Sequence, residues 1–426
     1  MELVVLFGVF LAGLVFGLPI AVALGLSSMA YILYQGLPLV IIPQRMYAGL
    51  DVFVLLSIPG FILAGNLMNF GGITERIVRF ANALVGWIRG GLGQANIASS
   101  LLFGGVSGTA VADAASIGGV MIPGMKKAGY PAPFAAAVTA ASSTVGPMIP
   151  PSVPMIIVGA LSGLSVGRMF MAGAIPGLLL GIAMMVTCYV VSRRNGYPVQ
   201  AWQGFAELAR SFASALWAIA MTALIIGGLV TGVATPTETA VVACIYAFLV
   251  GAFVYRGLRI RDVPRIVIQS GVSSAAILAL VGFANVFGWI LSTERIPQAI
   301  VGAVLGITEN RILVILLINL VLLFVGMFME TIAALIILFV PLLALATSVG
   351  VDPIHFATFA VLNLMLGLTT PPLGVCLFVC GSIARVSLQA VVRAIAPFLI
   401  CNLAVLMLVS YVPALSTWLP ALVFGN

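Results

Sequence analysis

Two short stretches of the sequence combine side-chain hydroxyls with prolines inside segments that are otherwise apolar. Residues 142–152 read SSTVGPMIPPS, and residues 366–374 read LGLTTPPLG. Proline breaks a helix and removes a backbone donor, so each stretch frees carbonyl oxygens next to Ser and Thr hydroxyls. Hard cations such as Na⁺ prefer oxygen ligands, and both stretches lack the thiols and imidazoles that transition metals favour. We therefore predict that each break binds a cation.

The elements that carry these stretches are expected to lie in a membrane. The chain has 426 residues, of which 62% are hydrophobic and 7% charged, whereas charged residues make up about a quarter of ordinary globular proteins. We count roughly ten to twelve apolar segments, several of them interrupted by Gly or Pro. The sequence predicts an all-α polytopic membrane protein with a single membrane domain over residues 1–426. Its first apolar run, residues 1–28, is interpreted as a span rather than a cleaved signal.

An internal repeat predicts two related halves, residues about 1–210 and about 211–426. The echoes are ITERI (73–77) with STERI (292–296), LFGG (102–105) with LFVG (323–326), and Pro150-Pro151 with Pro371-Pro372. Apolar segments that Gly or Pro interrupts at matching positions of two halves indicate a transporter binding site. Either break alone is equally well explained as a proline kink whose hydroxyls bond to the helix, and the matched pair favours the ion site.

A second interrupted apolar segment lies upstream of each break, FGGVSGTAVADAASIGG at 103–119 and FVGMFMETIAALI at 324–336. Each half is expected to contain a re-entrant hairpin, over about 90–125 and about 312–348, then a broken helix, over about 133–162 and about 354–380. Each hairpin tip would face the break of its own half and close an oxygen cage around an ion. Close helix packing is the rival explanation for the GxxxG of Gly104 and Gly108.

Few ionisable residues lie within the apolar segments, where a charge is costly and indicates function. Asp113 could hold a cation or stabilise the first hairpin, and Glu330 occupies the matching hairpin of the second half. Glu238, in TPTE, either has a function or caps the start of a helix. Arg295 could bind a substrate carboxylate, or it could extend to the membrane surface as an interfacial arginine.

Enzymatic functions are not indicated, so we expect no enzyme and no organic cofactor. His355 is the sole histidine, which excludes HExxH and Ser-His-Asp sets, and RGGLGQAN (89–96) is neither a Walker loop nor a dinucleotide fingerprint. The basic run RGLRIRDVPR (256–265) indicates a cytoplasmic loop. The net charge of +7 suggests contact with anionic membrane lipid and no nucleic-acid partner.

Three longer blocks then resemble a known family. GVSGTAVADAASIGGVMIPGMKKAGYPAPFAAAVTAASSTVGPMIPPSVPMIIVG, VTGVATPTETAVVACIYAFLVG and NLMLGLTTPPLGVCLF are similar to the large membrane subunit (M, DctM-like) of tripartite ATP-independent periplasmic (TRAP) transporters. The resemblance runs over nearly the whole chain. It implies a sodium-driven secondary importer with many spans in a bacterial inner membrane. The implied fold, of the ion-transporter group, has a scaffold and a transport domain with two re-entrant hairpins that moves as an elevator.

The resemblance also implies site residues, with substrate between the two hairpin tips and two or more coupling Na⁺ ions. Glycine and methionine would contribute carbonyl oxygens only. The first sodium site would comprise Ser107, Gly108, Thr109, Ser143, Thr144 and Gly146. The second would comprise Gly326, Met327, Thr331, Gly367, Thr369 and Thr370. The expected substrate contacts are Asp113, Ser142 and Arg295.

The partners that the resemblance implies are a four-helix membrane subunit and a periplasmic binding protein that delivers the substrate. The small subunit should be a separate polypeptide, because this chain begins directly with the large-subunit pattern. Family members carry organic acids, including C4-dicarboxylates and sialic acids, and the hydroxyl-rich SSTVGPM (142–148) favours sialic acid. The alternative function is a stand-alone anion or Na⁺/H⁺ exchanger of the same fold. A membrane enzyme or passive scaffold would leave the paired breaks unexplained.

Overall fold

The computed structural model describes residues 2–425, apart from the side chains of residues 105–107, and every regular element in this range is helical. Seven helices are long and apolar enough to cross a membrane, or eight if the bent pair Ala132–Met148 and Val153–Ser162 forms one span. The predicted all-α polytopic fold is confirmed. The count of roughly ten to twelve segments was higher because it included apolar helices too short to cross a bilayer.

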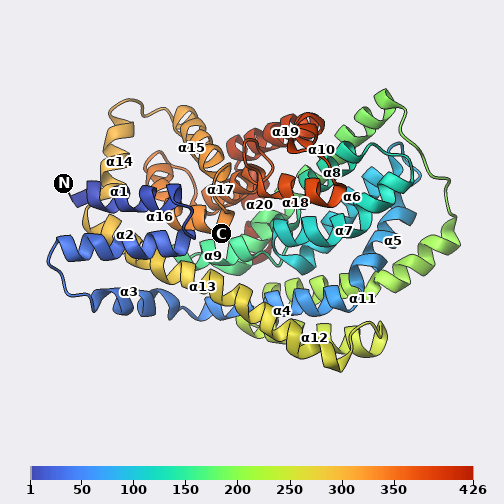
Figure 1. The fold of residues 1–426 in the computed structure, drawn as a ribbon, viewed down its shortest axis with the longest axis horizontal. Helices are drawn as coiled ribbons and strands as arrows, with labels where there is room; N and C mark the ends of the chain where they lie inside the picture. The colour runs from blue at the N-terminus through green and yellow to red at the C-terminus, as the bar shows by residue number, and fades with distance from the viewer. Residues whose placement is uncertain (1, 426) are drawn as a thin grey trace.

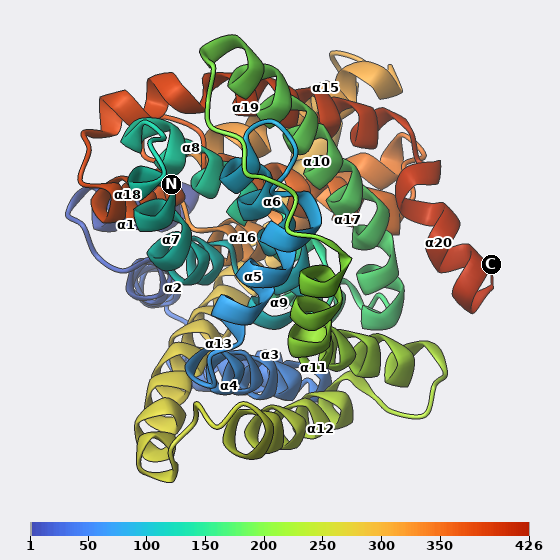
Figure 2. The ribbon, with the colours of Figure 1, turned by 90° about the vertical axis from the view of Figure 1, so that its right-hand side faces the viewer.

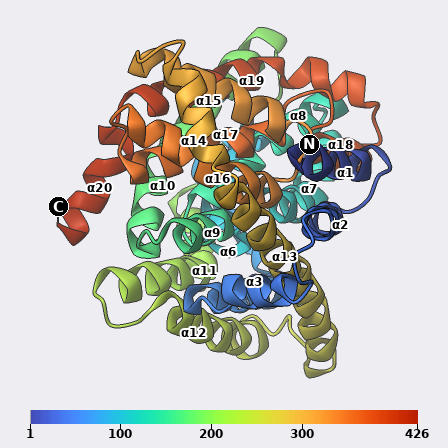
Figure 3. The same cartoon turned by 90° about the vertical axis from the view of Figure 1, so that its left-hand side faces the viewer.

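One group of long helices lies along one side of the molecule (Figures 1, 2 and 3). Within it α13 packs against α2, α3 and α4, and α12 packs along α4. We call these helices the scaffold group: α1 (Glu2–Val15), α2 (Ile20–Tyr34), α3 (Ile41–Leu50), η1 (Phe53–Leu56), α4 (Ser57–Phe70), α11 (Phe205–Val230), α12 (Pro236–Leu249), η3 (Val250–Val254), η4 (Ile260–Asp262) and α13 (Val263–Thr293).

The remaining helices form a second body, called the core group below. Two helices connect the groups: α5 (Ile73–Val85) packs between α6 and α11, and α14 (Ile296–Leu305) packs on α16. The core group comprises α6 (Gly91–Ser107), α7 (Ala110–Lys127), α8 (Ala132–Ser143), η2 (Gly146–Met148), α9 (Val153–Ser162), α10 (Val166–Asn195), α15 (Arg311–Gly326), α16 (Thr331–Ser348), α17 (Pro353–Gly367), α18 (Val375–Ala384), α19 (Leu388–Tyr411) and α20 (Ala414–Phe424).

Elements from the two sequence halves alternate in the core group. The first half contributes the helix pair α6–α7 and the interrupted helix α8–η2–α9, and the second contributes α15–α16 and α17–α18. α18 packs on α7 and α8, while α9 packs on α16 and α17. The halves therefore share one packed interior and do not form two separate bodies.

One of the three sequence echoes does not mark equivalent structural positions. ITERI begins helix α5 at Ile73, whereas STERI covers the end of α13 and the start of α14, with Arg295 in the left-handed region (φ 55°) between them. The other two echoes fall on comparable elements. LFGG and LFVG lie near the ends of α6 and α15, and each Pro-Pro pair, joined by a cis peptide bond, lies in an interruption.

The TPTE motif opens a helix, which confirms the capping interpretation of Glu238. The Thr235 hydroxyl accepts a hydrogen bond from the Glu238 N–H at 3.3 Å, and Glu238 Oε2 accepts one from the Thr235 N–H at 2.8 Å. This reciprocal pair is a capping box, which satisfies two backbone donors that the first turn of α12 would leave free.

In each half, the first hairpin helix meets the interrupted helix at a pair of glycines, which involves the break itself in the first half (Gly146) and the end of the helix before the break in the second (Gly367). A Cβ added to Gly104 would lie 2.6 Å from the Gly146 Cα, and one added to Gly367 would lie 2.5 Å from the Gly326 carbonyl carbon. Only glycine permits such a backbone approach. Close packing thus explains Gly104, whereas Gly108 has a positive φ of 65° that the hairpin turn requires.

We expect the Gly367→Ala substitution to destabilise the protein, because the added methyl group would overlap the backbone of α15. Overpacking of this kind costs about 1–3 kcal/mol. The matched control is Gly302→Ala in α14, where no atom lies within 4 Å of the added Cβ. Thermal unfolding of the purified protein in detergent should show a lower midpoint for Gly367→Ala and little change for Gly302→Ala. Equal midpoints would contradict the backbone contact.

Candidate functional site

The first hairpin tip lies against the break of its own half, as the sequence led us to expect. The tip is Gly108-Thr109, between α6 and α7, and the Thr109 hydroxyl accepts a hydrogen bond from the Ala112 N–H at 3.4 Å. A Cβ added to Gly108 would lie 3.4 Å from the Pro151 carbonyl oxygen. The side chain of Ser107, a predicted sodium ligand, lies outside the described residues.

The hydroxyls of the first break bond back to the helix that precedes them. Ser143 Oγ donates to the Ala140 carbonyl at 2.8 Å and Thr144 Oγ1 donates to the Ala141 carbonyl at 2.7 Å, and both side chains are fully buried. A hydroxyl that donates its hydrogen backwards keeps its oxygen lone pairs for another partner. This arrangement is compatible with both earlier interpretations, a proline kink and a cation site.

Asp113 is the buried charge beside this break. Its side chain is 0% exposed, and neither carboxylate oxygen has a hydrogen-bond partner among the described residues. A Cβ added to Gly146 would lie 3.3 Å from Asp113 Oδ2, so the carboxylate faces the break. A buried, unpaired carboxylate is strongly unfavourable unless a cation or a proton neutralises it.

Ser142 takes part in a polar contact between α6 and α8. Its Oγ donates to Asn96 Oδ1 at 3.1 Å and accepts a hydrogen bond from Ser100 Oγ at 3.0 Å. The second half contains a comparable contact between α15 and α17, where Asn363 Nδ2 donates to Asn319 Oδ1 at 2.8 Å. Each pre-break helix is therefore joined to the first helix of its hairpin by buried side-chain hydrogen bonds.

The second break repeats the local chemistry of the first. Thr369 Oγ1 and Thr370 Oγ1 both donate to the Leu366 carbonyl, at 2.9 and 2.8 Å. The hairpin tip between α15 and α16 approaches this break, since Thr331 Oγ1 donates to the Leu364 carbonyl at 3.4 Å. Met327 follows the glycine contact of Gly326 with Gly367 and caps the end of α15.

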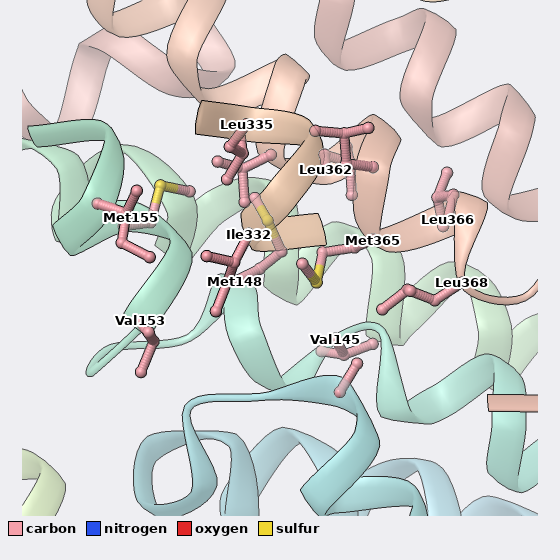
Figure 4. Packing of buried hydrophobic residues seen from close by; sticks show 14 of the residues in the cluster. Val145, Met148, Val153, Met155, Ile332, Leu335, Leu362, Met365, Leu366 and Leu368 are labelled. Carbon is pink, nitrogen blue, oxygen red and sulfur yellow. The ribbon is translucent and has the colours of Figure 1, made fainter. Parts of the chain in front are cut away.

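An apolar layer separates the two breaks (Figure 4). Val145 and Met148 from the first break face Met365 at the end of α17 and Leu368 from the second break, with Ile332 of α16 beside them. All five side chains are buried. Ions held at the two breaks would thus occupy separate polar sites with hydrophobic packing between them.

A cavity of about 430 Å³ lies where the two hairpin tips meet the scaffold group. Thr109 lines it from the first tip and Glu330 from the second, with α4 and α13 opposite. A hydrogen bond crosses from the scaffold to the core here, because Asn69 Nδ2 donates to Ser116 Oγ at 3.0 Å. The polar lining residues are Asn66, Asn69, Thr109, Ser116, Ser273 and Glu330.

None of the three expected substrate contacts lines this cavity. Asp113 faces the first break, Ser142 bonds to α6, and Arg295 is exposed at the turn between α13 and α14. Sequence reasoning instead missed Asn66, Asn69, Ser116 and Ser273. The two asparagines in GNLMNF were the available signal, since they lie three residues apart on one face of an apolar helix.

Two further hollows adjoin the scaffold helix α13. A cavity of about 390 Å³, lined by Arg45 and Asn285, lies between α3, α13, α9 and α16, and the Arg45 guanidinium is 4.8 Å from the centre of the Trp289 ring. A groove lined by Arg261 and Arg265 shares Ser273 with the cavity at the hairpin tips.

Comparison with known proteins identifies the family. The family described as "Tripartite ATP-independent periplasmic transporter, DctM component" matches residues 7–415. The chain is 41% identical over 415 residues to the sialic acid TRAP transporter large permease protein SiaM of Vibrio cholerae, and the match covers 97% of both chains. This chain belongs to the TRAP transporter DctM family.

Other comparisons extend this result. The C4-dicarboxylate TRAP transporter large permease protein DctM of Vibrio cholerae is 35% identical over 447 residues, a match that covers 100% of this chain and 99% of the relative. The fold is similar to that of the Alcanivorax borkumensis YdaH transporter, with a TM-score of 0.60, 14% identity, and coverage of 86% and 87% of the two chains. Relatives named for different organic acids thus match the chain over nearly its whole length.

Family membership confirms the resemblance noted in the sequence. As a TRAP transporter DctM component with seven or eight helices of spanning length, the chain is a multi-pass protein of the bacterial inner membrane. Its relatives are permeases, a class that carries solutes and catalyses no reaction.

In this TRAP component we expect the Asn319–Asn363 contact to couple the second hairpin to its break. A double-mutant cycle with Asn319→Ala and Asn363→Ala should give a coupling free energy of roughly 0.5–1.5 kcal/mol, as buried side-chain hydrogen bonds do in membrane proteins. Unfolding in detergent would measure it. Asn195→Ala is the control, because among the described residues that side chain bonds to the Val191 carbonyl of its own helix and to no other group, and its effect should add to that of Asn363→Ala. Additivity of the Asn319 and Asn363 effects would refute the coupling.

Proposed function

We propose that this chain is the carrier subunit of a sodium-coupled importer of an organic acid, of the sialic acid or C4-dicarboxylate class. A periplasmic binding protein would deliver the substrate, and a separate four-helix membrane subunit would complete the membrane complex. The observation that carries the proposal is the pairing of each hairpin tip with a helix break on two sides of one cavity. Irregular backbone at membrane depth is tolerated where it serves such a site.

Sodium would bind at the two breaks, at the site residues given above. The support is chemical: each break presents two hydroxyls whose hydrogens point to helix carbonyls and whose lone pairs are left for a ligand. Asp113 adds a buried negative charge beside the first break, which a bound cation would neutralise. Asp113 is thus assigned to the ion site in preference to the substrate.

The core group would move against the scaffold group as an elevator. The support is the loose packing of their interface, which contains the 430 Å³ and 390 Å³ cavities in succession along α13 and α16. Sliding along such an interface disrupts fewer close contacts than sliding through a filled one. The Asn69–Ser116 hydrogen bond would have to break during this movement.

The substrate would leave the cavity on the side of the basic groove. Residues 256–265 form the densest basic run of the chain, and the positive-inside rule favours a cytoplasmic position for this end of α13. The groove lined by Arg261 and Arg265 adjoins the cavity at Ser273. A basic groove attracts an organic anion, so the substrate would be released into the cytoplasm through the positively charged groove.

Uptake into proteoliposomes tests the function. The vesicles would contain this chain and its small subunit, with the binding protein outside, and would receive labelled sialic acid or a C4-dicarboxylate with or without an inward Na⁺ gradient. We expect uptake only when the gradient and the binding protein are both present. Uptake that ignores the binding protein would support the stand-alone exchanger instead.

The Thr369→Val variant tests the second ion site, since it removes the hydroxyl and keeps the shape of the side chain. Loss of a hydrogen-bonding group to a charged partner costs about 1.5–3 kcal/mol, which corresponds to at least a tenfold higher Na⁺ concentration for half-maximal uptake. Thr347→Val is the matched control, because its hydroxyl also bonds back to its own helix but is exposed. A similar Na⁺ dependence for both variants would argue against this site.

Asp113→Asn tests the first ion site, because it removes the charge that a cation would neutralise. We expect Na⁺-dependent uptake to fall at least tenfold while the amount of folded protein in the membrane stays the same. Glu309→Gln, an exposed carboxylate between α14 and α15, is the control. Near-normal uptake by Asp113→Asn would limit Asp113 to a structural role.

A further inference from the structure

The cavity at the hairpin tips has an unusual charge balance for a site that would bind an anion. No arginine or lysine is found among the described residues that line it, and Glu330 is the one ionisable side chain in that lining. The charge of an organic acid would therefore have to be met by backbone N–H groups, amides and hydroxyls. The positions of those groups decide how many carboxylates the cavity accepts.

Two helices begin at the cavity wall, α7 from the first hairpin and α16 from the second. Helix N-termini carry free N–H groups and a partial positive charge, so both would attract an anion. Their caps differ in charge. The α7 cap is the neutral Thr109 hydroxyl, whereas Glu330 Oε2 caps α16 by accepting hydrogen bonds from the Ile332 and Ala333 N–H groups at 2.9 and 3.3 Å.

The two helix starts differ in where their carboxylates lie. Glu330 caps α16 and lines the cavity, whereas Asp113, in the first turn of α7, faces the first break, where the proposed cation would neutralise it, and does not line the cavity. Val111 and Ala112, from the first turn of α7, line the cavity. A substrate carboxylate is therefore favoured at α7, and a second carboxylate directed to α16 would meet a like charge.

Glu330 also offers acceptor capacity on its side of the cavity. One of its oxygens caps α16, and no hydrogen bond to the other is found in the described part of the chain. The residue is exposed where it lines the cavity. A free carboxylate oxygen there suits a hydroxyl or an amide N–H of a ligand, both of which donate hydrogen bonds.

We infer that Glu330 is a specificity-determining residue that selects organic acids with one carboxylate and several hydroxyl or amide donors and excludes a second carboxylate. This inference rests on the proposed function and narrows its substrate class to hydroxylated monocarboxylates. The hydroxyls of SSTVGPM, which had favoured sialic acid, do not line the cavity, because they bond within the core group. The selectivity comes from the contrast between the Glu330 and Thr109 caps.

The test is ligand-induced thermal stabilisation of the detergent-solubilised complex with its small subunit, at saturating Na⁺. Omitting the binding protein removes its own selectivity from the measurement. The probes are sialic acid and gluconate, as hydroxylated monocarboxylates, and succinate, as a dicarboxylate without hydroxyls. We expect the wild type to require at least a tenfold higher concentration of succinate than of the better monocarboxylate for the same rise in melting temperature.

Substitutions at Glu330 separate its charge from its role as a cap. Glu330→Thr gives α16 a neutral threonine cap like that of α7, and it should reduce the preference for the monocarboxylate over succinate to threefold or less. Glu330→Asp keeps a charged cap and should retain the wild-type preference. Glu309→Gln, outside the cavity, should behave as wild type. Two results would overturn the inference and leave the transport function intact. In one, succinate stabilises the wild type as effectively as the monocarboxylates do; in the other, the Glu330→Thr variant keeps the wild-type preference for monocarboxylates. A complex that responds to neither class overturns the transport function, and this inference with it.

Discussion

A membrane helix that is broken by proline must have its freed backbone groups buried within the protein, and this requirement organises the whole molecule. Each break is covered by the hairpin of the same half, and the cover is tight enough to demand glycine at one side of each contact, at Gly104 in the first half and at Gly367 in the second. The surrounding helices α10, α19 and α20 enclose these two units. The hairpins are therefore needed to keep lipid away from the breaks, whatever ligand the breaks bind.

The same requirement concentrates polarity at a few interior points. Hydroxyls at the breaks bond back to helix carbonyls, and buried amides join each hairpin to the adjacent helix. Between the breaks the interior is apolar, around Met148 and Met365 (Figure 4). Asp113 is the exception, a buried charge without a hydrogen-bond partner among the described side chains, and such an exception needs a cation or a proton to persist. The energetic cost of Asp113 is thus the strongest physical argument for an ion at the first break.

The proposed substrate site lies at a different place, the cavity at the interface between the core and scaffold groups. The hairpin tips present two helix N-termini to one cavity, and the scaffold supplies Asn66 and Ser273 from α4 and α13. The breaks lie on one side of the hairpin tips and the cavity lies on the other, so in the proposed function each tip would contact both an ion site and the substrate site. Occupation of a break by an ion can therefore bias the position of a tip in the cavity, which is the physical basis for coupling two solutes.

The helical class, the membrane setting and the two helix interruptions were predictable from sequence, because they follow from composition and from the local properties of proline and glycine. The capping role of Glu238 was predictable for the same reason, since its partner Thr235 is three residues away. The re-entrant character of the two hairpins stays a prediction. Three features were not predictable from sequence: the alternation of the two halves, the contact of Ser142 with Asn96 and the exposure of Arg295. Neither was the lining of the cavity, where residues from α4, α7, α13 and α16 meet. Those features depend on which distant helices pack together, and packing of apolar surfaces is non-directional, so hydrophobic pattern alone does not specify the partner.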